Sequence, residues 1–357
     1  MFNQKKANFL SLDLGTANSL AYVSGQGVIY NEPSVMAYDV RTNKLIAVGS
    51  AAYEMVGKTH SNIRMVTPLV DGVISDLGAT TDLLRYIFDR IRLTNVWKNS
   101  IVLLACPSGV TELERAALRK VASEMGASHV LVEEEVKMAA IGAGINIHLP
   151  VGNLVLDIGG GTTDIAVIAS GDIIVSGSIK VAGRYIDEEI QKYLRSEQNV
   201  VIGEKTAEEI KCEIGSLIKF PNEKKTEKYG RDIVSGLPKR ILVNPEEIRN
   251  VMLHVFSKVI DLTINVLESA PPGLAGDIIK NGITICGGGA LIKGIDKYFE
   301  SIFEFPVRIS NDPLMSVING TKSFEKKLTD TLARAIIEEN QNDNEFQVSQ
   351  KRNRRFG

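Results

Sequence analysis

The stretch LVLDIGGGTTDIAVI, residues 154–168, decides the fold of this chain. Apolar residues on both sides are typical of buried strands, yet the middle holds three glycines, two threonines and two aspartates. Glycine tolerates backbone conformations that other residues avoid, and it lets successive N–H groups crowd around one anion. The stretch therefore predicts a hairpin whose turn binds an anion.

The same pattern, an apolar strand followed by Asp, an apolar residue, Gly, small polar residues and a second strand, occurs in FLSLDLGTANSLAYV, residues 9–23. A third variant, GITICGGGALIKGI at 282–295, runs from a strand into a glycine triplet and then into a helix. Asp13 and Asp157 occupy equivalent places in the two hairpins, 144 residues apart. Two such copies predict a duplicated domain, each half opening with a hairpin.

The two aspartates also predict a metal. Two carboxylates facing a polyphosphate would repel it unless a divalent cation lay between them. Mg²⁺ keeps most of its waters and takes one or two carboxylates beside phosphate oxygens. Asp13 and Asp157 are therefore expected to hold hydrated Mg²⁺, while the glycines and threonines of the turns face phosphate. The alternative is a pair of ordinary hairpins with glycine turns.

Length and composition bound the class of protein. A chain of 357 residues is longer than a single hydrophobic core usually accommodates, so two lobes are expected. With 44% hydrophobic and 24% charged residues it is typical of a soluble globular protein, and a net charge of −2 predicts no nucleic-acid partner. Its apolar runs fall short of the roughly 18 residues of a membrane span, and no signal-peptide region precedes Asp13. A cytoplasmic protein is expected.

The cysteines agree with that location. Cys106, Cys212 and Cys286 lie far apart and lack the spacing of metal ligands. Each lies in or beside an apolar segment, so we expect buried free thiols in a reducing compartment.

These motifs carry a resemblance. DLGTAN (13–18), DIGGGTTD (157–164) and GGGALIKGI (287–295) resemble the phosphate-1, phosphate-2 and adenosine motifs of the actin, Hsp70 and sugar kinase superfamily. The resemblance is closest to the MreB family, the bacterial actins that shape rod and helical cells. Further stretches similar to that family are NEPSV (31–35), PLVDGVISD (68–76), CPSGVTELERAAL (106–118), AAIGAG (139–144), VAGRYID (181–187), GEKTAEEIKCEIG (203–215) and ISNDPLMSVINGT (309–321).

The resemblance implies an α/β, actin-like fold with ATP in a cleft between two lobes. Each lobe would hold a ribonuclease-H-like core, with strands alternating with helices in parallel sheets, and a smaller subdomain. The implied parts are subdomain IA (1–33, 66–145 and 316–340), IB (34–65), IIA (146–183 and 245–315), IIB (184–244) and a basic tail (341–357). Within IIB, the polar run KFPNEKKTEKYGRD is expected to form a loop or hairpin.

Helix signals support this layout. Thr111 and Glu114 form a capping box that predicts a helix ending near Gly126. The run NPEE at 244–247 predicts another capped start, with Pro245 in the favoured first position. The helix after it carries a core-facing apolar stripe: Ile248, Met252, Val255, Val259, Leu262, Val266 and Leu267.

The resemblance also implies the nucleotide contacts. The phosphates would lie against Thr16, Ala17, Asn18, Gly159, Gly160, Gly161 and Thr162. The ribose and adenine would lie between Glu208, Glu209, Ile210 and Lys211 on one side and Gly288, Gly289, Ala290 and Leu291 on the other. The local pattern also allows a plain capping box, with Thr206 as N-cap and Glu209 at N3.

Hydrolysis needs a polar group that orients water in line with the γ-phosphate. The resemblance assigns this role to Glu135, with Glu134 as the one-residue alternative and Thr162 as partner. The family usually has Glu-Pro-Met here, whereas this chain has Val136 and Lys137, which frees the helix start and adds a charge nearby. A weak ATPase is therefore expected. The alternative for these glutamates is simple complementarity to the helix dipole.

Two stretches indicate a membrane surface. Val96 and Trp97 lie among basic residues in RIRLTNVWKNS (90–100), which suits a lipid headgroup interface. The tail KRNRRFG (351–357) carries four basic residues, Lys351, Arg352, Arg354 and Arg355. The alternatives are a tryptophan packed on its own lobe and a solvated tail.

The resemblance therefore implies a cytoskeletal protein that binds ATP or ADP with Mg²⁺ and helps to determine cell shape. It would polymerise with itself, hydrolyse ATP slowly and lie on the anionic inner face of the cell membrane, with other shape-determining proteins as candidate partners. The alternative is a small-molecule kinase of the same superfamily, although the chain shows no insertion for an acceptor site.

Overall fold

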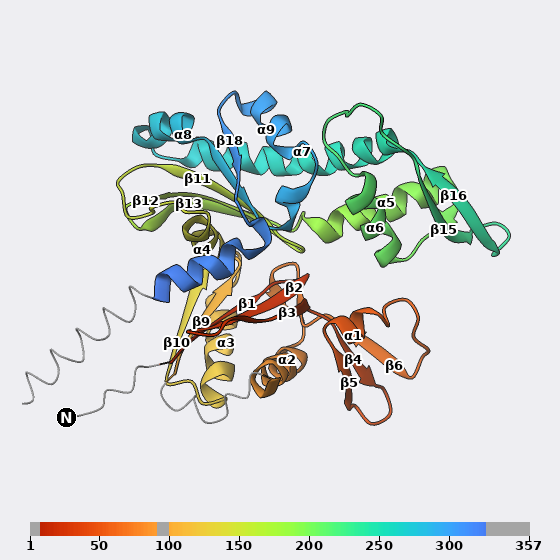
Figure 1. Ribbon diagram of the computed structural model, residues 1–357, viewed down its shortest axis with the longest axis horizontal. Helices are drawn as coiled ribbons and strands as arrows, with labels where there is room; N and C mark the ends of the chain where they lie inside the picture. Colours follow the sequence, from red (N-terminus) through yellow and green to blue (C-terminus); the bar gives the residue numbers. More distant parts are fainter. Residues whose placement is uncertain (1–7, 91–99, 326–357) are drawn as a thin grey trace, which may run out of the picture.

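The computed structural model describes residues 8–90 and 100–325. Two five-stranded sheets form the centres of two lobes (Figure 1). The first has the order β10-β9-β1-β2-β3 and the second the order β13-β12-β11-β17-β18. The strands are β1 (Asn8–Leu14), β2 (Asn18–Val23), β3 (Gly27–Pro33), β9 (Ser100–Cys106), β10 (His129–Glu134), β11 (Asn153–Ile158), β12 (Thr163–Ala169), β13 (Asp172–Ile179), β17 (Ile283–Cys286) and β18 (Val307–Ile309).

The two sheets share one topology, which agrees with the predicted duplication. In each, the first three strands form an antiparallel meander, and two later strands add in parallel beside the first. The expectation of parallel sheets holds for only part of each sheet, because both sheets are mixed. Short turns can join only antiparallel neighbours, whereas strands reached through helical crossovers run parallel.

A smaller three-stranded sheet follows the third strand of each meander. The first has the order β5-β4-β6 and the second β14-β15-β16. Their strands are β4 (Met36–Asp39), β5 (Leu45–Val48), β6 (Ile63–Val66), β14 (Val200–Val201), β15 (Thr226–Asp232) and β16 (Pro238–Val243). Strands β7 (Leu69–Val70) and β8 (Val73–Ile74) form a short ladder. The polar run, expected to be a loop or hairpin, forms a loop followed by β15, the first strand of the β15–β16 hairpin, whereas the subdomain bounds stay a prediction.

Helices cover the sheets. They are α1 (Ser50–Tyr53), α2 (Leu77–Arg90), α3 (Glu112–Glu124), α4 (Glu135–Gly142), α5 (Gly183–Glu197), α6 (Glu204–Ile214), α7 (Pro245–Ser269), α8 (Ala275–Asn281) and α9 (Ile295–Phe303), with short 3₁₀ turns η2 (Pro272–Leu274), η3 (Gly288–Leu291) and η4 (Pro313–Met315). Residues 316–325 are also helical. The third glycine motif (282–295) runs from β17 into the 3₁₀ turn η3 and only then into helix α9, not directly into a helix.

Two of the three predicted helix starts are confirmed. Thr111 caps α3 in a complete capping box, and the Asn244 side chain accepts the N–H of Glu246 at the start of α7. The predicted cap at Thr206 was wrong, because α6 begins three residues earlier, with Gly203 in the N-cap position and no side-chain cap. The first residues of α6 are all polar, so helical apolar periodicity could not indicate where the helix begins.

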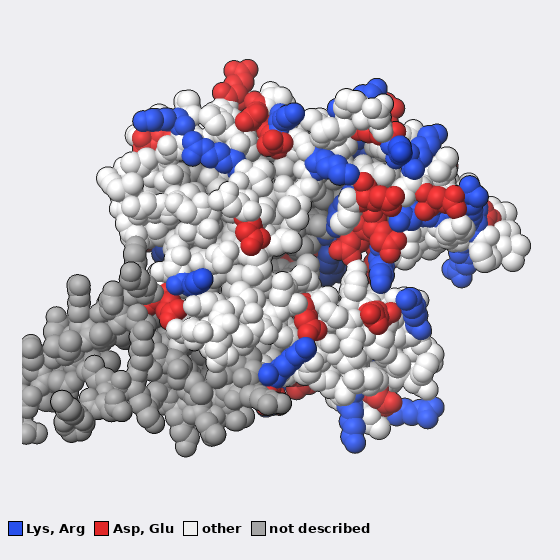
Figure 2. All heavy atoms as spheres, in the orientation of Figure 1, with Lys and Arg blue, Asp and Glu red and all other residues white. Residues whose placement is uncertain are grey.

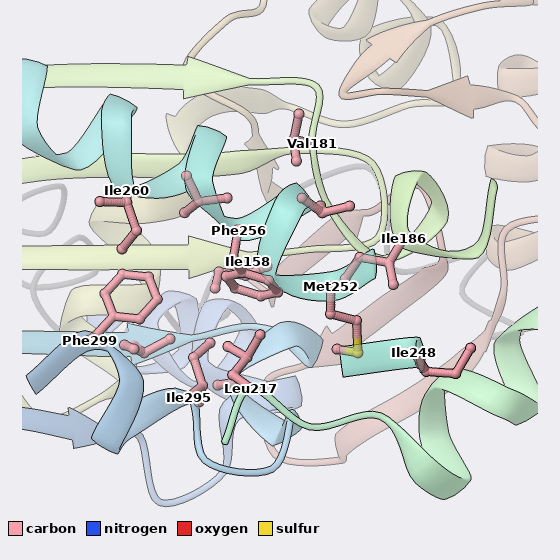
Figure 3. Packing of buried hydrophobic residues seen from close by; sticks show 14 of the residues in the cluster. Ile158, Val181, Ile186, Leu217, Ile248, Met252, Phe256, Ile260, Ile295 and Phe299 are labelled. Carbon is pink, nitrogen blue, oxygen red and sulfur yellow. The ribbon is translucent and has the colours of Figure 1, made fainter. Parts of the chain in front are cut away.

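The stripe on α7 packs into the core of the second lobe, in one cluster with Ile158 and Phe299, and the ring of Phe256 lies 6.4 Å from that of Phe299 (Figure 3). In the described part of the chain, α7 is the one helix long and apolar enough to span a membrane by length and composition. Six of its apolar side chains are at most 3% exposed: Ile248, Met252, Val255, Phe256, Val259 and Val266. Its apolar character is therefore accounted for by the core.

Helix α4 joins the lobes. It contacts strands of both large sheets, and its Val136, Met138 and Ala140 belong to one cluster with Phe9, from the first sheet, and with residues of the second. A Cβ atom at Gly142 would lie only 1.8 Å from the carbonyl oxygen of Ser316. Glycine is required there because helical residues 316–325 cross α4 in direct backbone contact.

The thiols are free, but only two of the three are buried. Cys106 and Cys286 lie in strands of the two sheets and are at most 2% exposed. The prediction of a buried Cys212 was wrong, because this residue lies on the exposed face of α6. An isolated cysteine on an amphipathic helix does not by itself indicate which face it occupies.

Candidate functional site

The two predicted turns lie against each other. A Cβ atom at Gly160 would lie 2.6 Å from that of Ala17, and one at Gly161 would lie 2.4 Å from Oγ1 of Thr16. The N–H of Gly72 points to the same Oγ1 at 3.4 Å. Only glycine lets the second turn approach the first so closely, so the sequence pattern and the contact have one cause.

The third glycine motif closes the site from the second lobe. The φ of Gly287 is +77°, and a Cβ atom there would lie 2.4 Å from Oδ1 of Asp157. Likewise, a Cβ at Gly289 would collide with Ile158 at 2.2 Å. The start of η3 therefore packs directly on the end of β11.

Four carboxylic acids gather where these turns meet. Asp13, Asp157 and Asp164 are 8%, 7% and 2% exposed. Burial raises the pKa of Asp13 to about 7. Burial, and then the charges of Asp164 and Asp13, raise the pKa of Asp157 to about 8. Burial, followed by Asp13, Asp164 and Asp157, also raises the pKa of Glu135 well above its usual value. Each ionised group thus opposes the ionisation of the others.

Glu135 and Glu134 face different surroundings. Glu135 is the first residue of α4, and its Oε1 is buried without a hydrogen-bond partner. Glu134, the N-cap residue, pairs instead with Arg115 of α3 at 3.7 Å. Of the two glutamates that the sequence left open, Glu135 is therefore the one coupled to all three aspartates.

The two residues that depart from the family pattern do not enter the carboxylate group. Val136 is fully buried in the cluster between the lobes. The expected charge beside the site was wrong for Lys137, whose ammonium pairs with Glu133 at 3.8 Å and with Asp172 at 3.4 Å. Because successive residues of a helix point about 100° apart, Lys137 leaves the helix on another side from Glu135.

This set of groups fits a hydrated divalent cation. No described residues form a group of three or more His, Cys, Asp or Glu side chains suited to hold a metal directly. Buried carboxyls with raised pKa values and the unpartnered Oε1 of Glu135 are what a positive ion with its own waters would stabilise. Asp13 and Asp157, on the two lobes, would hold Mg²⁺ through water.

The predicted adenosine walls, α6 and η3, are tied together. Ser216, just after α6, pairs with Lys293, just after η3, and Leu217 N–H donates to the Lys293 carbonyl at 2.9 Å. Leu291 is 58% exposed and offers an apolar surface, whereas Ile210 is fully buried in the core. The side chain of Ile210 can therefore support the wall only from behind.

The three polar side chains of α6 that were expected to contact the nucleotide have partners within the protein. The ammonium of Lys211 donates to Asp187 at 2.8 Å and to the Gly183 carbonyl at 3.1 Å. Glu209 pairs with Lys228 at 3.2 Å, and Glu208 accepts a hydrogen bond from Tyr53 of the opposite lobe. Lys211 therefore supports the second lobe beside the phosphate turn.

Two residues of the site were missed in the sequence. Asp164 lies opposite Asp157 in the β11–β12 register and accepts the N–H of Ser108 from the other lobe at 3.1 Å. Its place in DIGGGTTD was a signal that could have found it. Ser34 stiffens the first turn. Its hydroxyl donates to the Gly15 carbonyl at 2.6 Å, and its N–H donates to the Ala17 carbonyl at 2.8 Å.

The candidate membrane residues lie outside the described residues: Val96, Trp97, Lys351, Arg352, Arg354 and Arg355.

Comparisons with known proteins cover most of the chain. The model of the MreB/Mbl protein family matches residues 7–333. The chain is 42% identical over 315 residues to the cell shape-determining protein Mbl of Bacillus subtilis, which covers 88% of this chain and 95% of that protein. It is 38% identical over 321 residues to the cell shape-determining protein MreB of Escherichia coli, covering 88% and 92%.

Solved structures are similar as well. The crystal structure of MreB5 of Spiroplasma citri bound to AMPPNP has 64% sequence identity and a TM-score of 0.90, covering 93% of this chain and 99% of that one. The same protein bound to ADP gives a TM-score of 0.89. The MamK double helical filament, at 24% identity and a TM-score of 0.74, shows the shared fold alone.

Proposed function

Because this chain belongs to the MreB/Mbl family of bacterial actin-like cell-shape proteins, we propose that it binds ATP with Mg²⁺ between its lobes and polymerises into filaments. The observation that carries the proposal is the contact of the two glycine turns, with Asp13 and Asp157 buried together behind them. The AMPPNP and ADP complexes of the Spiroplasma citri protein support the same ligand here.

The chain's own residues bind the phosphates. Backbone N–H groups of both glycine turns face the polyphosphate, and the hydroxyls of Thr16 and Thr162 add donors. Bound Mg²⁺ would neutralise phosphate charge and lower the pKa values of the carboxyls around it. Since the two turns belong to different lobes, a ligand that contacts both favours one closed arrangement.

Glu135 is the residue that we assign to hydrolysis, with Thr162 as its partner. Its carboxylate would orient the attacking water through Oε1, which is buried and has no hydrogen-bond partner in the protein. Lys137 turns away to Glu133 and Asp172, so it does not neutralise Glu135. A slow ATPase coupled to assembly follows.

A closed subunit can repeat head to tail in an open filament. Each Lys or Arg near an anionic membrane contributes about 1 kcal/mol, so the four tail charges supply roughly 4 kcal/mol, a dissociation constant near millimolar. A filament presents many tails and many copies of Trp97, which raises avidity steeply. We infer filaments on the inner face of the cell membrane that help to determine cell shape, with other shape-determining proteins as partners.

Sedimentation tests the proposal. The protein is expected to pellet with ATP and Mg²⁺ and to remain soluble with ATP in EDTA, and electron microscopy on anionic liposomes should show membrane-bound filaments. Asp157→Ala should lose metal-dependent ATP binding and pelleting together, whereas Asp261→Ala, on the exposed face of α7, should keep both. Undiminished ATP affinity in Asp157→Ala would refute the site.

A further inference from the structure

One hydrogen bond crosses the mouth of the cleft. The hydroxyl of Tyr53, the last residue of α1, donates to Oε2 of Glu208 in α6, 155 residues away along the chain. The ammonium of Lys205, also on α6, lies 5.3 Å from the centroid of the Tyr53 ring. Figure 1 shows α1 on the lower lobe and α6 on the upper lobe, and Figure 2 shows acidic side chains gathered above the notch between these parts.

The lower lobe holds Tyr53 in place. The N–H of Ser50, which opens α1, donates to Glu32 at 3.1 Å, and Glu32 pairs with Arg90 at the end of α2 at 2.5 Å. The Tyr53 ring is half-buried against a small cluster with Val35 and Ala52. Because both its helix and its ring are anchored, little conformational freedom remains to be lost when the hydroxyl meets Glu208.

The upper lobe links Glu208 to the phosphate turn. Lys211, one turn further along α6, donates to the carbonyl of Gly183. The N–H groups of Gly183 and Arg184 donate in turn to the carbonyls of Gly159 and Gly160, at 3.2 and 2.8 Å. The bond from Tyr53 therefore reaches an element that is rigidly attached to the phosphate-binding glycines.

We propose that Tyr53 is a latch between the lobes, so that bound nucleotide escapes only when the Tyr53–Glu208 hydrogen bond opens. The inference rests on the proposed nucleotide site, because the nucleotide would lie behind this contact. A carboxylate accepts several hydrogen bonds, so Glu208 can hold Tyr53 and a ribose hydroxyl together. Tyr53 then acts as a positioning residue that sets the rate of nucleotide exchange.

The direct test is the dissociation rate of etheno-ADP, whose label is on the base and leaves the ribose free. The probe is bound to dilute protein with Mg²⁺ and displaced by excess unlabelled ADP in a stopped-flow instrument. Tyr53→Phe removes the hydroxyl and keeps the ring over which Lys205 lies. Dissociation is expected to become about threefold to tenfold faster, where tenfold corresponds to about 1.4 kcal/mol, with a smaller change in association rate.

Tyr229→Phe is the matched control. The Tyr229 hydroxyl also donates to a carboxylate, that of Glu227 at 2.7 Å, but both residues lie on β15 within one hairpin. This variant should release etheno-ADP at the wild-type rate. Thermal unfolding followed by circular dichroism shows whether each variant is folded, so a faster rate can be assigned to the latch.

A second variant tests the partner. Glu208→Met removes the acceptor while keeping side-chain length and helix propensity. In that background Tyr53→Phe should change the dissociation rate by less than twofold, and an undiminished effect would overturn the latch. An unchanged or slower rate for Tyr53→Phe in the otherwise native chain would also overturn it. If the native chain does not bind etheno-ADP at all, the proposed nucleotide site fails instead.

Discussion

Asp157→Asn should weaken the site and stabilise the metal-free fold. The substitution keeps the shape of the side chain and removes its ionisation. Asp157 is 7% exposed, and its pKa is raised to about 8, first by burial and then by Asp164 and Asp13. A carboxyl retained for ligand binding therefore opposes folding when no cation is present, as is common at functional sites.

The magnitude follows from the pKa. A rise from 3.8 to about 8 spans roughly four pKa units, and about 1.36 kcal/mol per unit sets a ceiling near 5 to 6 kcal/mol at pH 8. The buried amide of asparagine gives back about 1 to 3 kcal/mol, so a net gain of about 2 to 5 kcal/mol is expected. The folded pKa lies above the unfolded one, so the native carboxyl loses stability as pH rises from about 4 to 8. The gain should therefore shrink toward pH 5.

Urea unfolding followed by circular dichroism measures this effect, in EDTA without nucleotide, at pH 5, 6.5 and 8. Asp261→Asn, at an exposed position of α7, is the matched control and should leave the free energy of unfolding unchanged. ATP titration with Mg²⁺ should show at least tenfold weaker binding in Asp157→Asn. The reasoning is refuted if Asp157→Asn is no more stable than the native chain at pH 8, or if its gain is independent of pH.

Three further predictions address hydrolysis, the core and the membrane. Glu135→Ala should lower phosphate release several-fold at unchanged ATP affinity, because water positioning acts mainly in the transition state, and the reverse ranking with Glu134→Ala would shift the assignment by one residue. Phe256→Ala, at a position 1% exposed, should lower the free energy of unfolding by about 3 to 5 kcal/mol in urea, and a loss below about 1 kcal/mol would contradict its place in the core. Deleting residues 351–357 should reduce co-sedimentation with phosphatidylglycerol vesicles at low salt, where charge is least screened, and Trp97→Ala should reduce the salt-resistant remainder. Equal binding to neutral vesicles would contradict the electrostatic part.

Much of the site was predictable because its signals are local. Glycine runs are required wherever two backbones touch, so the stretches around Asp13 and Asp157 identified both hairpins, and the repeated pattern identified the duplication. The Thr111 cap and the stripe of α7 were equally readable, since capping and helical periodicity depend only on neighbours within a few residues.

Other features depend on which distant segments meet. The sequence alone could not decide between Glu134 and Glu135, because their difference arises from Arg115 on one side and three aspartates on the other. It also misplaced Lys137, whose acidic partners come from two separate strands.

By itself, the sequence determined the lobes, the phosphate-facing turns and the family resemblance. These depend on short segments, because glycine is required where two backbones touch and helical periodicity involves only nearby residues. The tertiary structure alone decided how the carboxyls share their charge and which side chains cross the cleft. Tyr53 carries no local signal, since its partner lies 155 residues away in the other lobe. Charge coupling and cross-lobe contacts depend on distances through space, which only the packing of the two lobes on α4 sets.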